Sequence, residues 1–289
     1  MDGFLLQIFS GLANGSIYAA VGLALVMIYQ STHHINFAQG EMATFATFIA
    51  WSLIENGMSY WLAFFLTVGI AFVGGLVVQR IFIRPVERAP ILNNVIVFVG
   101  LLVIFNAMSG WIFDHTVKAF ASPFPTVSAV FPKYISGHQL GSLGVTLAVL
   151  LVVYLFFRYT PIGLAMRAAA QNPDSASLVG IRVSWMLALG WGLASAIGAV
   201  AGMMMAPVMF LDPNLMAGIL LYGFAAALLG GIDNPWGAVI GGFIVGVLEN
   251  ILGAYVPARD AGLRRSGKGY GGCRLQGRSA AGSRQPPGR

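Results

Sequence analysis

Charged residues are scarce in this sequence: Asp, Glu, Lys and Arg make up 9% of its 289 residues, whereas 57% of them are hydrophobic. Together with a mean hydropathy of +0.79, this composition excludes an ordinary soluble globular protein. The single cysteine, Cys273, excludes an intrachain disulfide. His33 and His34 are adjacent and cannot share a helix face, and His115 and His138 have no cysteine or HExxH pattern nearby. We therefore expect no enzyme site, no metal and no cofactor bound by this chain.

Long uncharged apolar runs recur throughout residues 1–257, each close to the roughly 20 residues that span a bilayer as a helix. The first run is preceded by Asp2 and exceeds a signal-peptide core, so it should remain as a membrane helix. The sequence predicts one all-α domain, a polytopic transmembrane helix bundle of about eight helices. The expected helices cover residues 3–29, 37–54, 60–79, 91–113, 139–157, 184–210, 215–230 and 236–256.

Arginines are concentrated in two connections between these runs. Arg80, Arg84 and Arg88 follow the third run, and Arg158, Arg167 and Arg182 follow the fifth. The two connections are two crossings apart and lie on one face, which the positive-inside rule assigns to the cytoplasm. If all eight runs cross, the N-terminus and the end of the last run lie outside.

Small residues recur every four positions in three of the runs and predict close helix packing rather than substrate contacts. They are Gly11, Gly15 and Ala19 in the first run, Ala194, Gly198, Gly202 and Ala206 in the sixth, and Gly237, Gly241, Gly242 and Gly246 in the eighth.

Residues 158–182 predict two short surface helices. Thr160 can cap the first and Pro161 can open it; this helix must end before Pro173, and Gly180 can close the second. A structured connection of this size indicates a surface that docks into a partner's groove. A helix lying among the lipid headgroups is the alternative.

Polar residues inside the apolar runs are candidates for a substrate path, because a charge in hydrocarbon is costly and usually functional. Asn36 and Gln39 have the spacing of a helix N-cap and its reciprocal partner, which places Glu41 in a first turn; an ordinary helix start explains them equally well. Asn14 and Glu249 can face a cavity or another helix. We predict a path lined by the first, second and eighth helices.

Four segments within about residues 5–257 carry a family resemblance: Gly22–Met42 (GLALVMIYQSTHHINFAQGEM), Arg158–Ile181, Ser195–Met203 and Ala226–Glu249, with its GG…PxGA…GG…E pattern. They resemble the LivH-like permeases, the membrane subunits of branched-chain amino-acid ABC transporters. The resemblance implies the ABC-importer permease fold and an ATP-driven importer in the bacterial inner membrane. It further implies a second permease subunit, two cytoplasmic ATPase subunits that use ATP, and a periplasmic substrate-binding protein.

The same resemblance implies that residues 158–181 couple the membrane domain to the ATPases, with Ala169 as a small residue on the docking helix. The implied coupling residues are Thr160, Pro161, Gly163, Arg167, Ala168, Ala169, Asn172 and Gly180. Urea and short-chain amide permeases share these motifs and remain an alternative. Two other classes remain: an ion-coupled secondary transporter with Glu41 or Glu249 in its relay, and a scaffold protein.

Residues 258–289 lack the apolar runs of the rest of the chain. They hold 8 of the 16 Lys and Arg residues but only one acid, Asp260, so the net charge of +6 arises in this tail and no nucleic-acid surface is expected. Members of the resembled family end with an apolar helix and an Arg-Pro-x-Gly-Leu sequence, which this chain lacks. We expect the Arg/Gly/Ser-rich tail to be disordered and non-native or frameshifted; binding to anionic lipid headgroups is the alternative.

Overall fold

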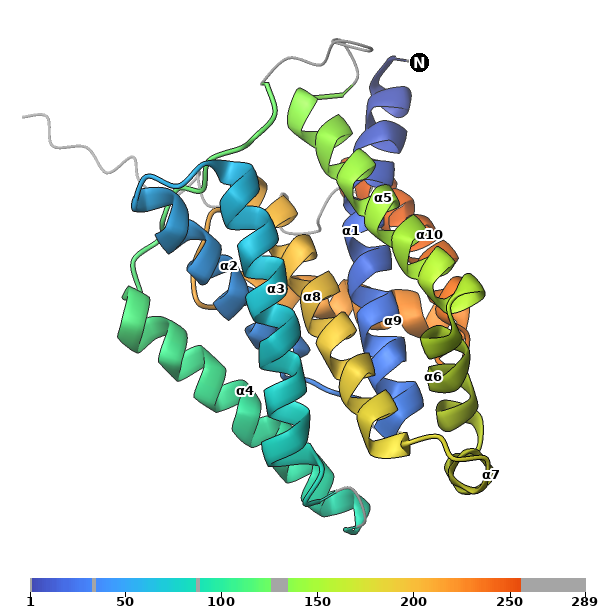
Figure 1. Ribbon diagram of the computed structural model, residues 1–289. Helices are drawn as coiled ribbons and strands as arrows, with labels where there is room; N and C mark the ends of the chain where they lie inside the picture. Colours follow the sequence, from blue (N-terminus) through green and yellow to red (C-terminus); the bar gives the residue numbers. More distant parts are fainter. Residues whose placement is uncertain (1, 33–34, 87–88, 126–134, 256–289) are drawn as a thin grey trace, which may run out of the picture.

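The computed structural model describes residues 2–32, 35–86, 89–125 and 135–255, and these residues form an all-α bundle (Figure 1). Each of the eight predicted runs is a helix with ends within a few residues of those expected, so the predicted fold class is confirmed. The helices are α1 (Asp2–Thr32), α2 (Gln39–Glu55), α3 (Tyr60–Val78) with the π-helical turn η1 (Gln79–Ile83), α4 (Ile91–Phe113), α5 (Gly137–Tyr159), α6 (Pro161–Gln171), α7 (Pro173–Leu178), α8 (Val183–Met209), α9 (Leu215–Gly230) and α10 (Pro235–Tyr255).

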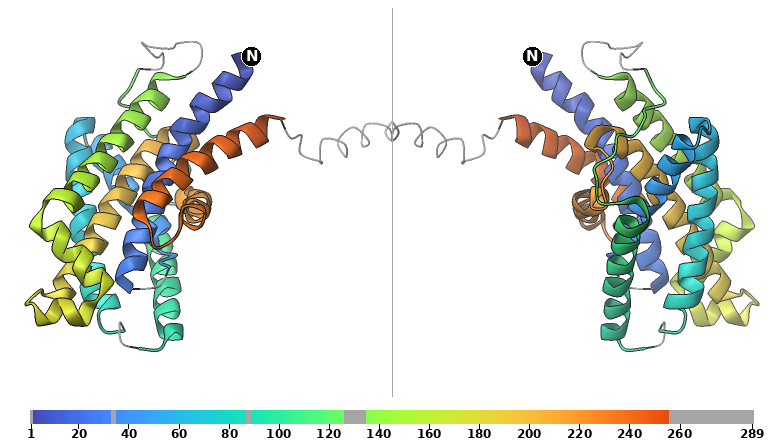
Figure 2. Two further views of the ribbon diagram at one scale, coloured as in Figure 1. Left: turned by 90° about the vertical axis from the view of Figure 1, so that its right-hand side faces the viewer. Right: turned by 90° about the vertical axis from the view of Figure 1, so that its left-hand side faces the viewer.

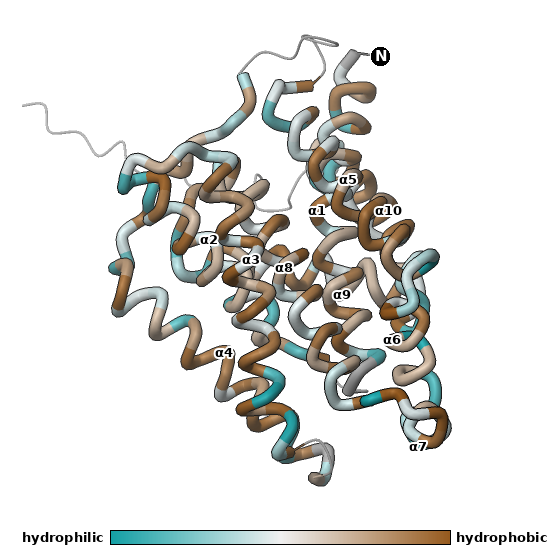
Figure 3. Tube along the Cα trace, viewed as in Figure 1, coloured by the Kyte–Doolittle hydropathy of each residue, from teal (hydrophilic) through white to brown (hydrophobic). Residues whose placement is uncertain are grey.

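Two helices form the centre of the bundle. In the apolar stretch of α1, 89% of the residues are buried, and in that of α8 78% are buried, against 22–28% in α3, α4, α5 and α10. The outer helices expose large apolar side chains such as Phe65, Val152 and Ile240. Hydrophobic residues run along the long helices and hydrophilic ones are concentrated toward the ends of the bundle (Figure 3). An apolar exterior of this kind suits a lipid environment.

Six of the described helices are long and apolar enough to cross a membrane: α1, α3 with η1, α4, α5, α8 and α10. The remaining two of the predicted eight are shorter. Helix α9 has 16 residues and lies across the long helices, so that it is seen nearly end-on in the quarter-turn view (Figures 1 and 2). Helix α2 has 17 residues and begins inside the bundle, where Gln39, Gly40 and Glu41 are buried.

Arg88 lies outside the described residues, and the described parts of both arginine-rich connections lie at one end of the bundle, the lower end in Figure 1. The N-terminus lies at the opposite end, and the end of α10 is close to it, because the rings of Phe4 and Tyr255 are 6.3 Å apart. This arrangement agrees with the prediction that the arginines share one face.

Backbone contact joins α1 to α10. A Cβ on Gly11 would lie 2.7 Å from the Cα of Val247, and one on Gly15 would lie 3.0 Å from the carbonyl oxygen of Gly242. Any side chain at these positions would push the two helices apart. The predicted packing role of these small residues is therefore confirmed.

Candidate coupling surface and substrate path

Helix α6 begins as the sequence predicts. The Thr160 hydroxyl accepts a hydrogen bond from the Gly163 amide at 3.0 Å, and Pro161 occupies the first turn. A Cβ on Gly163 would lie 2.5 Å from the carbonyl oxygen of Phe156, so glycine allows α6 to fold back closely on the end of α5. These contacts fix the angle between α5 and α6.

Helix α7 continues the same connection. The Asn172 side chain accepts a hydrogen bond from the Ser175 amide at 2.9 Å, and Pro173 opens the helix. Gly180 has φ +85°, a left-handed conformation that favours glycine just beyond a helix end. The two predicted short helices are confirmed, and together they give residues 160–180 a defined shape.

The two faces of this connection differ in exposure. Met166 and Ala169 are buried, and Ala169 has no exposed surface. Ala169, the small residue predicted on the docking helix, therefore packs within the chain, where an aspartate would disrupt the fold. Leu178 and Val179 are instead 87% and 76% exposed, so apolar surface projects beyond the bundle at this end.

The sequence prediction did not name Leu178 and Val179. An apolar pair directly before Gly180 in a polar connection does, however, indicate exposed apolar side chains. Arg167 is also exposed and Ala168 half-exposed. An exposed apolar patch of this kind on a connection between membrane helices is typical of a docking surface.

The start of α2 differs from the predicted capping pattern. The Asn36 side-chain oxygen accepts a hydrogen bond from the Ala38 amide at 3.0 Å, but no side chain caps the helix. The Gln39 side chain donates to the Ala194 carbonyl of α8 at 2.9 Å instead of returning to Asn36. Because Gln39 is buried, bonding across to α8 satisfies its side-chain NH2 group inside the bundle, whereas its side-chain oxygen has no hydrogen-bond partner among the described residues. Glu41 lies in the first turn, as predicted.

Glu41 belongs to a polar group of residues that are distant in the sequence. The Asn106 side-chain amide of α4 donates to the Glu41 carboxylate at 3.2 Å and to the Asn214 side-chain oxygen at 3.0 Å. We call Glu41, Asn106 and Asn214 the Glu41 group. Glu41 is 5% exposed, whereas Asn214 is exposed. The group therefore connects a buried carboxylate to the surface just before α9.

Glu249 belongs to a second group, formed by Tyr18, Tyr222 and Glu249. The Tyr18 hydroxyl of α1 donates to the Glu249 carboxylate at 2.9 Å, and the ring of Tyr18 stacks on that of Tyr222 at 5.0 Å between centroids. Glu249 thus faces other helices, one of the two placements that the sequence left open. Asn14 lies one turn before Tyr18 on α1 and is half-buried, without a hydrogen-bond partner among the described residues.

Glu41 and Glu249 lie in two separate groups, whereas Asn14, Asn36 and Gln39 belong to neither group. A path lined by α1, α2 and α10 stays a prediction. Helix α9 connects the groups, because Asn214 directly precedes its first residue and Tyr222 lies in its middle. Between them, Gly218 and Leu221 of α9 are exposed. Hydropathy gives no sign that α9 lies across the bundle, and for this reason the sequence missed it. Asn106 is an amide within an apolar run, and this feature of the sequence could have indicated that α4 contributes to a polar group.

The sequence that folds into this bundle matches a known family. A model described as "Branched-chain amino acid transport system / permease component" matches residues 7–264. The chain belongs to this permease family. The match includes both polar groups and the α6–α7 connection, and it ends just inside the predicted tail. The tail itself, residues 258–289, lies outside the described residues.

Three relatives show how much of the chain the likeness covers. The high-affinity branched-chain amino acid transport system permease protein LivH of Escherichia coli (strain K12) is 30% identical, covering 88% of this chain and 87% of that protein. The corresponding BraD protein of Pseudomonas aeruginosa (strain PAO1) is 28% identical, covering 85% of each. A probable LivH protein of Methanocaldococcus jannaschii is 26% identical, covering 83% of this chain and 78% of that protein.

The permease is thus a multi-pass membrane protein whose relatives are transport proteins rather than enzymes. Among the described residues, no three or more His, Cys, Asp or Glu side chains are grouped so that they could hold a metal ion.

Proposed function

We propose that this permease subunit provides the translocation path of an ATP-driven importer for branched-chain amino acids in the bacterial inner membrane. The observation that carries the proposal is the match to the permease family over residues 7–264. The LivH and BraD relatives, named for branched-chain amino acid transport, support this substrate class. ATP is then bound and hydrolysed by partner subunits.

The α6–α7 connection is the proposed ATPase docking site. It lies at the arginine-rich end of the bundle, which the positive-inside rule makes cytoplasmic (Figure 1). Leu178 and Val179 supply apolar side chains for a groove on the ATPase, and the capped helices hold these side chains in place. A periplasmic binding protein would deliver substrate at the opposite end, and a second permease subunit would complete the path.

The Glu41 and Glu249 groups are the proposed substrate contacts. Carboxylates held between helices of a membrane bundle are costly and are kept where they serve transport or pairing. An amino acid carries an ammonium group that a carboxylate can bind while its apolar side chain contacts the neighbouring helices. Exposure of Asn214, just before α9, and of Tyr222 on α9 supports access to both groups from outside the chain.

Reconstitution tests the whole proposal. The permease is purified with its associated proteins and placed in proteoliposomes with ATP, radiolabelled leucine and the binding protein. Co-purification of an ATPase pair and ATP-dependent leucine uptake, blocked by excess leucine but not by urea or acetamide, would support it. Uptake blocked by urea or acetamide instead would identify an amide permease. Uptake driven by a proton or sodium gradient without ATP would identify a secondary transporter, and absence of uptake would favour a scaffold.

A further inference from the structure

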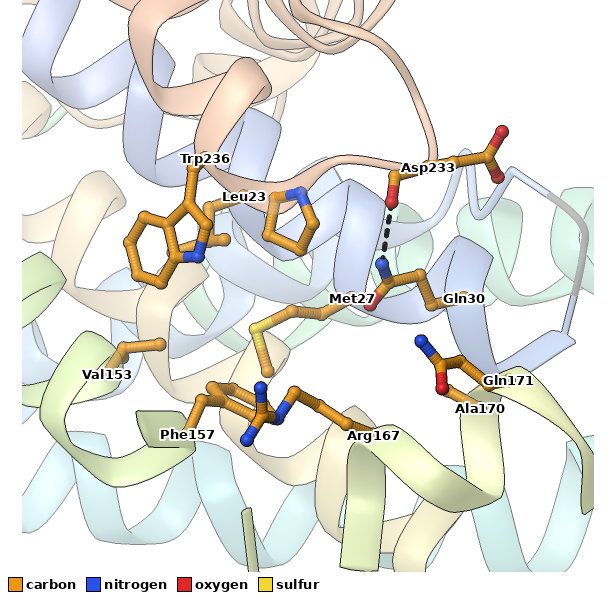
Figure 4. A pocket seen from close by; sticks show the side chains of 11 residues that line it. Leu23, Met27, Gln30, Val153, Phe157, Arg167, Ala170, Gln171, Asp233 and Trp236 are labelled. Carbon is orange, nitrogen blue, oxygen red and sulfur yellow. Dashed lines mark hydrogen bonds between the residues drawn. The ribbon is translucent and has the colours of Figure 1, made fainter. Parts of the chain in front are cut away.

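A cavity of about 370 Å³ lies beside α6, away from both polar groups (Figure 4). Met27 and Gln30 of α1, Phe157 of α5, Arg167 of α6 and Trp236 of α10 contribute to its wall. Four separate helices therefore build it. Its volume lies near the lower limit of the roughly 300–1,000 Å³ typical of small-molecule sites.

The cavity has a positive charge that the protein does not neutralise. Arg167 has no ion-pair or hydrogen-bond partner within the part of the chain that the structure describes. Asp233 lies on the rim, but its carboxylate points away from the cavity, and its backbone carbonyl accepts the Gln30 side-chain amide at 2.9 Å (Figure 4). An anion entering the cavity would therefore meet a guanidinium free to form charge-assisted hydrogen bonds.

The polar and apolar parts of the wall are on different sides. Gln30 and Gln171 lie on one side and Trp236 on the other, with Arg167 and Phe157 below and between them (Figure 4). The amide of Gln171 can add a hydrogen bond to a group held by Arg167. Trp236 and Phe157 offer aromatic surface to a hydrocarbon group. The cavity thus suits a small molecule with an anionic head and an apolar tail.

We propose that this cavity is a binding site for a small carboxylate with a short apolar tail. The carboxylate pairs with Arg167 and Gln171, and the tail lies against Phe157 and Trp236. A guanidinium binds a carboxylate through two parallel hydrogen bonds, which a lysine would not reproduce. The site is separate from the Glu41 and Glu249 groups, because none of their residues lines this cavity.

Because the cavity lies beside α6, a bound ligand would affect transport. Helix α6 packs on α5 and α8, whereas the cavity separates Arg167 from α1 and from Trp236. A bound molecule would fill this gap and restrain α6. If the proposed function is correct, the ligand accumulating in the cytoplasm would slow the importer by holding its coupling helix; the binding itself needs no ATPase.

Binding is measured with the full-length permease in detergent and with 4-methylpentanoate as the probe, through the fluorescence change of Trp236. We expect a saturable signal that is absent from Trp236→Phe. Arg167→Gln should weaken binding at least tenfold, and the matched variant Arg158→Gln, whose arginine lies outside the cavity wall, should bind as the parent does. Equal binding by Arg167→Gln and the parent would overturn the proposal, as would equal loss in Arg158→Gln.

A second pair of variants tests whether the probe needs the volume of the cavity. Ala170 lines the cavity and Ala168 does not, yet both are half-buried on α6. Ala170→Phe should abolish binding measured by equilibrium dialysis with radiolabelled probe, and Ala168→Phe should retain it. Addition of phosphatidylglycerol in place of phosphatidylcholine should not displace the probe. Displacement by phosphatidylglycerol, or binding of this lipid alone, would assign the cavity to a lipid headgroup and overturn the carboxylate site.

Discussion

Replacing Leu178 by aspartate should separate the permease from its ATPase without unfolding it. The Leu178 side chain is 87% exposed in the chain, so the substitution removes almost no internal contact. If the side chain is buried in an ATPase groove, its full burial contributes roughly 1.5–3 kcal/mol, and an aspartate loses that contribution. A loss of about 2 kcal/mol corresponds to roughly 30-fold weaker binding.

The measurement is the dissociation constant of the ATPase subunit for the permease in lipid nanodiscs. Val117→Asp is the matched control, because Val117 is 66% exposed at the other end of the bundle and loses a similar apolar side chain. ATPase affinity should fall at least about tenfold in Leu178→Asp and stay within about twofold in Val117→Asp. Unchanged affinity in Leu178→Asp, or equal losses in both variants, would refute the docking role of this connection.

Three further changes address the path, the packing and the cap. Glu249→Gln keeps the acceptor of Tyr18 but removes the charge, so leucine uptake should fall at least tenfold at an unchanged amount of protein in the membrane; normal uptake would exclude Glu249 from the path. Gly246→Leu should force α1 from α10 and lower stability by about 1–3 kcal/mol, seen as a lower melting temperature in detergent, unlike Gly253→Leu in open space. Thr160→Ala should lower the stability of the first turn of α6 by about 1 kcal/mol, seen as faster hydrogen exchange of the Gly163 amide. Unchanged exchange would show that the cap is dispensable.

Local signals in the sequence predicted the helices well. Apolar runs predicted all eight helices, including the six long enough to span a membrane, because a spanning helix must satisfy its backbone internally and present apolar side chains to lipid. Thr160, Pro161 and Pro173 gave the short helices because capping depends on neighbours within one turn. Gly11 and Gly15 gave a packing seam because their spacing places them on one helix face.

Contacts between distant segments were not predictable from the same signals. Gln39 has the spacing of a capping partner, but the carbonyl of Ala194, 155 positions away, receives its hydrogen bond. Ala169 and Leu178 differ completely in exposure, although the same connection was assigned as a whole to docking. Which side of a short helix faces outward depends on α5 and α8, and a single sequence does not reveal where these helices lie.

The glycine seam between α1 and α10 also has a consequence for biosynthesis. Gly15 and Gly242 are about 230 positions apart, so at roughly 5–20 residues per second the ribosome needs about 10–45 s to supply the partner of α1. During this interval the glycine face of the most buried helix is covered by lipid or by another protein. A polypeptide interrupted before α10 would keep that face exposed to lipid or to a substitute partner, because its own partner helix is never made.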